Sequence, residues 1–171
     1  MELDHATRLI TESDKDERNA RAARLVDLYD LLGSASVVLH GQAAQLLFED
    51  VKATWLYGYF TGTVLTSYAF CVQQLAGLIR MASDDSDLPD EAATLEALAE
   101  IAARHALVDI DVRARLIGLN DSASVYLSAN LSNYDRQFEH RAEDAERFSD
   151  EHTLLIDARS ALECCVGLLY R

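Results

Sequence analysis

The sequence is poor in the residues that punctuate strands, loops and linkers. It has one proline and seven glycines among 171 residues, too few for a succession of hairpins or for a flexible linker between domains. Half of its residues are hydrophobic, which excludes the disordered and low-complexity classes. We therefore expect a single helical domain over residues 1–171.

Cysteine and histidine are scarce, and their spacing indicates no metal site. Cys71, Cys164 and Cys165 have no zinc-binding pattern, and the adjacent pair stands in an apolar stretch, so we expect buried thiols in a reducing cytoplasm. No two of the five histidines have the spacing of a helical zinc protease. A glycine-rich phosphate loop is also absent, and we expect neither a cofactor nor a bound metal. Residues 1–8 are polar and predict no export signal.

Basic residues are outnumbered by acidic ones. The chain carries 15 basic and 29 acidic residues and has a formal net charge of -14. A surface of this sign repels phosphates and disfavours sequence-independent binding of duplex DNA. A basic partner is electrostatically favoured instead.

Charge is missing altogether from Ala53 to Ile79. At about 1.5 Å per residue, this stretch is long enough to cross about 30 Å of hydrocarbon. Threonine, tyrosine and glycine lower the mean hydropathy of this stretch below the level typical of membrane-spanning helices. We therefore expect a helix surrounded by other helices. We expect no contact with a membrane. Trp55, Tyr57 and Tyr59 at one end add more apolar surface than a small bundle needs to cover, which favours a homodimer.

Apolar residues recur at helical spacing through most of the chain. The pattern predicts an all-α, antiparallel bundle of about five to seven helices with short connections. Residues 1–52 are expected to form an N-terminal helical pair, and residues 53–171 the main core. The helices are expected at residues 16–32, 34–52 with Ser34 or Ser36 as N-cap, 54–82, 91–105, 110–119 and 142–171. An acidic loop at residues 83–90 and a polar loop or broken helix at residues 120–134 separate the later helices.

One polar segment carries a resemblance to a known family. Residues 119–130 read LNDSASVYLSAN, and they follow a long uncharged helix, an acidic loop and two helices, and precede a final helix. This succession resembles the HEPN domains of prokaryotic toxin-antitoxin and anti-phage systems, which are small helical bundles. The resemblance implies a HEPN-like core over residues 53–171 and a homodimer. It also implies a nucleotidyltransferase-like antitoxin, or another defence protein, as partner.

Catalytic HEPN domains carry an Arg-x(4-6)-His motif that cleaves RNA without metal. The resemblance implies that the arginine holds the charge developing on the phosphate and that the histidine moves protons. In this chain the arginine of the motif would fall at Ala123 and the histidine at Ser128. The polar residue of the motif, which is often Asn, would fall at Ser124. Alanine and serine perform neither task, so we expect an inactive chain, either a diverged member or a disarmed variant of a nuclease. RNA becomes a partner only if the motif is restored.

A literal match to the motif lies nearer the end of the sequence. Arg147 and His152 satisfy Arg-x(4)-His, although acidic residues stand between them where the family has apolar ones. They form the alternative catalytic pair.

The alternative interpretation of the whole chain is a non-enzymatic acidic helical protein that binds a basic partner or mimics nucleic-acid charge. Restoring arginine at position 123 and histidine at position 128 should create RNA cleavage only under the HEPN interpretation.

Overall fold

A computed structural model describes residues 2–32, 39–82, 94–127 and 150–169, and the side chains of residues 14–30, 39–82, 94–127 and 153–169. The helices in these ranges are α1 (Glu2–Leu32), α2 (Gln42–Leu56), α3 (Phe60–Ala82), α4 (Leu95–Arg104), α5 (Ile110–Leu127) and α7 (Asp150–Leu169). No strand occurs among the described residues. The prediction of an all-helical bundle is confirmed for this part of the chain.

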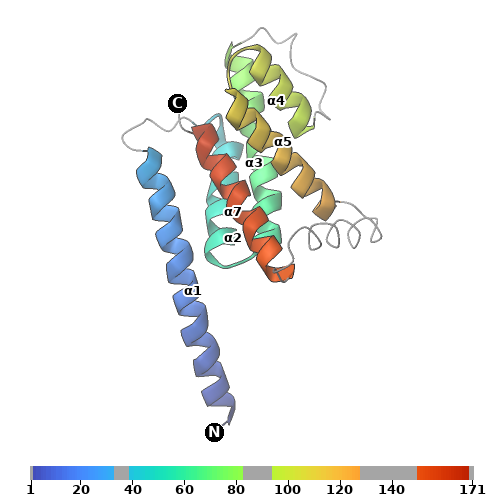
Figure 1. Ribbon diagram of the computed structural model, residues 1–171. Coiled ribbons are helices and arrows are strands. Elements are labelled where there is room, and N and C mark those ends of the chain that lie inside the picture. Colours follow the sequence, from blue (N-terminus) through green and yellow to red (C-terminus); the bar gives the residue numbers. More distant parts are fainter. Residues whose placement is uncertain (1, 33–38, 83–93, 128–149, 170–171) are drawn as a thin grey trace.

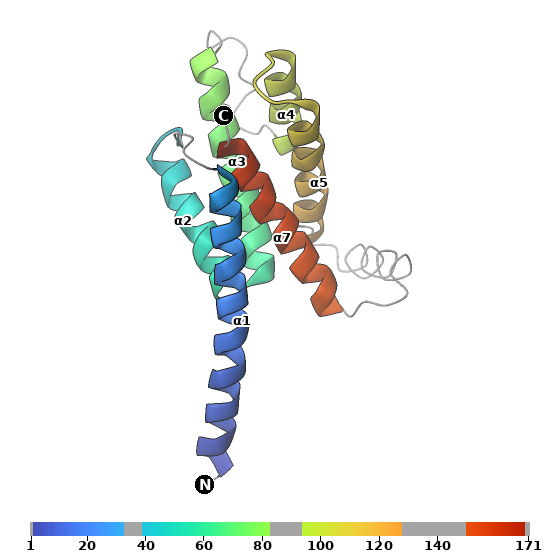
Figure 2. The same cartoon turned by 60° about the vertical axis from the view of Figure 1, so that its left-hand side comes forward.

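The helix α3 lies at the centre of the bundle. It packs against α2, α4, α5 and α7, which lie around it in Figures 1 and 2. Phe70, Leu75 and Ile79 are among its fully buried side chains. The sequence explains this position, because a helix without charged side chains up to Ile79 can be buried on most sides at little electrostatic cost.

The helix α1 lies on the outside of the bundle, against α2 and α7. Its carboxyl-terminal half provides the contacts, through buried residues such as Arg21 and Leu28. In both views the amino-terminal half of α1 extends beyond the other helices (Figures 1 and 2). The bundle core is therefore built from α2 to α7, with α1 docked along one side.

Among the described helices, α3 is long and apolar enough to cross a membrane, with a mean hydropathy of 1.2 over its most apolar window. Core helices of soluble proteins meet the same two criteria. The four helices packed against α3 favour the core-helix interpretation, and the absence of membrane contact stays a prediction.

The expected continuous helix over residues 54–82 is wrong. The chain turns at residues 57–59 between α2 and α3, where Gly58 has a φ of +73°, in the left-handed region that glycine adopts at little cost. The Nε of Arg21 donates to the carbonyl of Leu56 at 3.1 Å and so satisfies one of the carbonyls that end α2. The sequence hides this turn, because apolar residues continue through it without a proline or a charge.

The second helix also begins later than expected. It starts at Gln42 with a glycine as N-cap, so the caps predicted at positions 34 and 36 are wrong. The backbone N–H of His40 donates to Oε1 of Gln74 on α3 at 3.0 Å. A Cβ on Gly77 of α3 would come within 2.2 Å of the Cβ of His40. Residues 39–41 are thus held against α3 in a non-helical form. The contacts that hold them come from α3 and cannot be predicted from residues 39–41 alone.

The fifth helix continues to Leu127, so the expected loop or broken helix from residue 120 is wrong up to that point. Leu116, Leu119 and Ala123 are buried at helical spacing and carry the amphipathic pattern into the polar segment. Residues 128–134 lie outside the described residues. So do residues 142–149 of the expected last helix, which is described from Asp150.

Two further boundaries differ from the expectation. The helix α1 begins at Glu2 rather than at residue 16. The helix α4 begins after Thr94, whose Oγ1 accepts a hydrogen bond from the N–H of Ala97 at 3.2 Å and so caps the helix. The expected division at residues 52 and 53 falls inside α2.

Candidate functional site

The structure describes two of the three positions at which the HEPN motif would fall. Ala123 on α5 has no exposed surface and packs in the core. Ser124 is exposed, and its Oγ donates to the carbonyl of Asp121 at 2.7 Å. Ser128 lies outside the described residues. Successive residues of a helix point in different directions, so Ala123 faces the interior and Ser124 faces solvent.

The alternative pair lies mostly outside the described part of the chain. Arg147 is not among the described residues. His152 belongs to the first turn of α7, but its side chain is not described. The alternative catalytic pair therefore stays a prediction.

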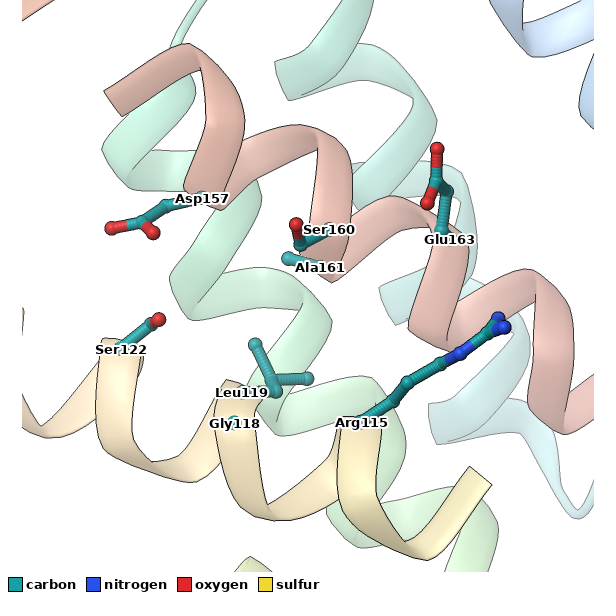
Figure 3. A pocket seen from close by; sticks show the side chains of 8 residues that line it. All are labelled: Arg115, Gly118, Leu119, Ser122, Asp157, Ser160, Ala161 and Glu163. Atoms are coloured by element: carbon teal, nitrogen blue, oxygen red, sulfur yellow. The ribbon is translucent and has the colours of Figure 1, made fainter. Parts of the chain in front are cut away.

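A cavity of about 450 Å³ lies between α5 and α7, beside the expected motif positions. Figure 3 shows the two helices facing each other, with Ser122 of α5 opposite Asp157 of α7 and Arg115 reaching from α5 toward α7 at the other end. The lining residues are Arg115, Gly118, Leu119 and Ser122 of α5 and Asp157, Ser160, Ala161 and Glu163 of α7. The cavity thus presents guanidinium, hydroxyl and carboxylate groups around a small apolar centre.

Glu163 is held in its ionised form at one end of this cavity. Its Oε1 accepts hydrogen bonds from Arg24 of α1 and from the Nε of Arg159, the second at 3.0 Å. Burial raises the pKa of the Glu163 carboxyl, but the hydrogen bonds from the two arginines outweigh burial and leave that pKa below its ordinary value. Glu163 therefore stays a carboxylate at neutral pH and is unsuited to act as a general acid.

Asp157 at the other end also has a partner. The hydroxyl of Tyr126 on α5 donates to its Oδ2 at 2.9 Å and links the two helices. Among the described residues, no histidine, cysteine or lysine lines the cavity, and these are the side chains that most readily move protons or attack near neutral pH. The described part of the chain also holds no group of three potential metal ligands. This geometry suits the binding of a polar group better than proton transfer.

A second hollow, of about 610 Å³, lies between α1 and α2. We call it the α1–α2 groove. Its lining consists of Leu25, Val26, Tyr29, Glu49, Lys52, Ala53, Leu56 and Tyr57. Val26 and Tyr57 are each 57% exposed, and Tyr59 nearby in sequence is 66% exposed. Trp55, which we expected on this surface, is buried. Exposed apolar groups gathered in this way are typical of protein contact surfaces.

None of the predicted site residues that the structure describes lines this cavity. The described part of the segment 119–130, which carries the resemblance, meets the cavity only at Leu119 and Ser122, and the α7 side was missed. Asp157, Ser160 and Glu163 recur every third residue along α7, and this polar stripe is the signal that could have drawn attention to them. The pairing of that stripe with α5 depends on how the two helices pack. No spacing within either helix predicts it.

Comparison of the chain with protein-family models, with curated proteins and with solved structures finds no match.

Proposed function

We propose that this chain is a HEPN-like protein of a cytoplasmic toxin-antitoxin or anti-phage system, and that it acts by binding a partner rather than by cleaving RNA. The observation that carries the second part of this proposal, binding rather than RNA cleavage, is the complete burial of Ala123. A guanidinium that holds a phosphate must reach an open cleft, and a position enclosed by apolar core offers it neither water nor substrate. The uncharged α3 at the centre, followed by α4, α5 and α7, supports the likeness to the family.

The charge of the neighbouring cavity supports the same proposal. The cavity presents the carboxylates of Asp157 and Glu163 against the single guanidinium of Arg115. RNA binding sites are basic, because phosphates are held by arginine and lysine. A cavity of this composition favours a ligand other than RNA.

The proposed protein is a homodimer, with the α1–α2 groove as its contact surface. Sedimentation velocity at micromolar concentration tests this, with Val26→Asp placing a charge in the groove and Ile110→Asp as a control at another exposed aliphatic residue. We expect the wild type and Ile110→Asp to be dimers and Val26→Asp to be a monomer. A wild-type monomer in both low and high salt would contradict the homodimer and weaken the HEPN proposal.

A second candidate function is that of an acidic helical protein that binds a basic partner. The charge distribution favours it: the described side chains include 14 acids and ten bases, whereas residues 83–93 hold five acids and no base. Residues 83–93 thus carry acidic charge at a higher density, and without compensating bases, than the described helices do. Concentrated charge of one sign favours an oppositely charged partner.

Binding of an oligoarginine peptide tests the second candidate. If the acidic segment is a recognition surface, affinity should fall steeply with potassium chloride, and replacement of Asp84, Asp85 and Asp87 by asparagine should weaken binding at low salt. The matched control replaces Asp109, Asp111 and Asp121 of the α5 region by asparagine, which removes the same charge elsewhere. Equal losses of oligoarginine affinity for the two triple variants would contradict a dedicated binding surface at residues 83–93.

A further inference from the structure

The three cysteines of the chain come together between α3 and α7. Cys71 lies on α3, and Cys164 and Cys165 lie on α7. All three are free thiols with exposed fractions of 2% or less. The Sγ of Cys165 lies 3.9 Å from the Sγ of Cys71 and 3.9 Å from the carbonyl oxygen of Ser67, one turn before Cys71. Two residues separated by 94 positions thus bring their sulfur atoms into contact.

The arrangement favours one of the possible pairs. A disulfide has a sulfur–sulfur bond of about 2.05 Å, so Cys71 and Cys165 require only an approach of about 2 Å, which side-chain rotation and a small shift of two helices can supply. Cys164 and Cys165 are successive residues of a helix, and such residues do not face each other. Cys164 is also a neighbour of Cys71 and raises the pKa of its thiol. The sulfur–sulfur contact of 3.9 Å joins Cys71 to Cys165, and we take this pair as the one that forms the bond.

We propose that Cys71 and Cys165 are an oxidation site, at which a small peroxide converts two thiols into a disulfide that locks α3 to α7. In the first step one sulfur, as thiolate, attacks a peroxide oxygen, the O–O bond breaks, and a sulfenic acid and hydroxide form. In the second step the other sulfur attacks the sulfenic sulfur, the S–S bond forms, and the hydroxyl leaves as water once it takes up a proton. Overall, two thiols and one hydrogen peroxide yield one disulfide and two waters, and two electrons pass from sulfur to oxygen.

Burial sets the rate of this reaction and the kind of oxidant. Burial raises the pKa of the Cys71 thiol, and its two cysteine neighbours raise it further, so Cys71 is protonated at neutral pH and reacts slowly. A small uncharged oxidant can enter a core that opens transiently, whereas a bulky charged disulfide reagent is excluded. We therefore expect slow oxidation by hydrogen peroxide that becomes faster with rising pH.

The cross-link closes a long loop of chain that contains α4 and α5. Closing a loop of this length restricts the unfolded chain and favours the folded state. Oxidation should therefore raise the melting temperature, by about 5 to 15 °C if the bond forms without strain. Reduction with dithiothreitol should return the melting temperature to its original value.

The test oxidises the folded wild-type chain with hydrogen peroxide and then counts free thiols in denaturant. We expect the count to fall from three to one, and peptide mass mapping to join the peptides that contain Cys71 and Cys165. Three remaining thiols after prolonged treatment with excess hydrogen peroxide at raised pH, where the reaction should be fastest, would overturn the proposal. So would a map that joins Cys71 to Cys164, Cys164 to Cys165, or two chains.

Variants separate the proposed pair from general oxidation of the core. Cys164→Ala should keep the disulfide and the rise in melting temperature, whereas Cys71→Ala and Cys165→Ala should lose both. Circular dichroism checks that each variant is helical before oxidation. Because the peptide map is made on the wild type, the proposal remains testable even if a variant fails to fold.

Discussion

Trp55 of α2 and Arg21 of α1 are joined through the backbone. The indole N–H of Trp55 donates to the carbonyl of Arg21 at 2.9 Å, and the Nε of Arg21 donates to the carbonyl of Leu56 at 3.1 Å. Arg21 is 8% exposed and Trp55 is 2% exposed. Buried polar groups that satisfy each other are costly to separate. This pair determines where α1 joins the bundle and where α2 ends.

Arg21→Ala should therefore destabilise the chain by about 2 to 3 kcal/mol, because it removes a charged hydrogen bond in a buried setting and leaves the Leu56 carbonyl without that donor. Arg18→Ala is the matched control: Arg18 is 46% exposed and pairs with Asp14, so its loss should cost less than about 1 kcal/mol. Urea unfolding monitored by circular dichroism measures both. Equal losses would show that burial of Arg21 contributes nothing to stability.

Two glycines within helices should respond in opposite directions to the same substitution. Gly77→Ala should destabilise by about 1 to 3 kcal/mol, because the new Cβ would lie 2.2 Å from the Cβ of His40. Gly118→Ala should stabilise by up to about 1 kcal/mol, since an added Cβ there meets nothing within 4 Å. Thermal melts give the two signs directly. A higher melting temperature for Gly77→Ala would contradict the close approach of the chain before α2 to α3.

Arginine at position 123 should unfold the bundle rather than create activity. Ala123→Arg places a guanidinium in apolar core without a partner, and we expect a loss above about 3 kcal/mol. Ser124→Arg, one residue further on the exposed face, should change stability by less than about 0.5 kcal/mol. Denaturant unfolding of both variants provides the comparison. A stable Ala123→Arg variant that cleaves RNA when combined with Ser128→His would support the family motif at this position and contradict the described packing.

The ion pairs of Glu163 should make stability depend on acid pH. Because the folded-state pKa of Glu163 lies below its ordinary value of 4.5, its contribution to stability is present above pH 4.5 and is lost as the pH falls through the lower folded-state pKa. Glu163→Gln should thus be less stable than the wild type at neutral pH, and the difference should shrink below pH 4.5. Asp121→Asn, at an exposed residue of α5, is the control with little effect. A difference that grows toward acid pH would contradict the assigned ion pairs.

The helices were predictable because they follow from the spacing of apolar residues along the chain. The uncharged stretch after Ala53 predicted a central helix, and α3 occupies that position. The turn at Gly58 was not predictable, since it depends on Arg21 reaching across from α1. The non-helical form of His40 likewise depends on Gln74, which lies 34 positions away. Contacts between distant residues decided these two boundaries, whereas the start of α4 depends on the local cap at Thr94.

The candidate site was predictable only in part, for the same reason. The described part of the segment that carries the resemblance meets the cavity only at Leu119 and Ser122, and the opposite wall comes from α7. The interior orientation of Ala123 follows from the continuation of α5 to Leu127, and the polar composition of residues 120–122 concealed that continuation. The sequence of residues 119–130 alone therefore did not predict which of its side chains face the core and which face solvent.

Incubation of the purified chain with labelled single-stranded RNA separates the proposed partner binding from RNA cleavage. The assay includes a metal chelator, because the resemblance implies metal-free chemistry, and uses Arg147→Ala and His152→Ala as paired variants. We expect intact RNA with the wild type and with both variants over hours at neutral pH. Cleavage by the wild type that either variant abolishes would contradict it and assign catalysis to Arg147 and His152.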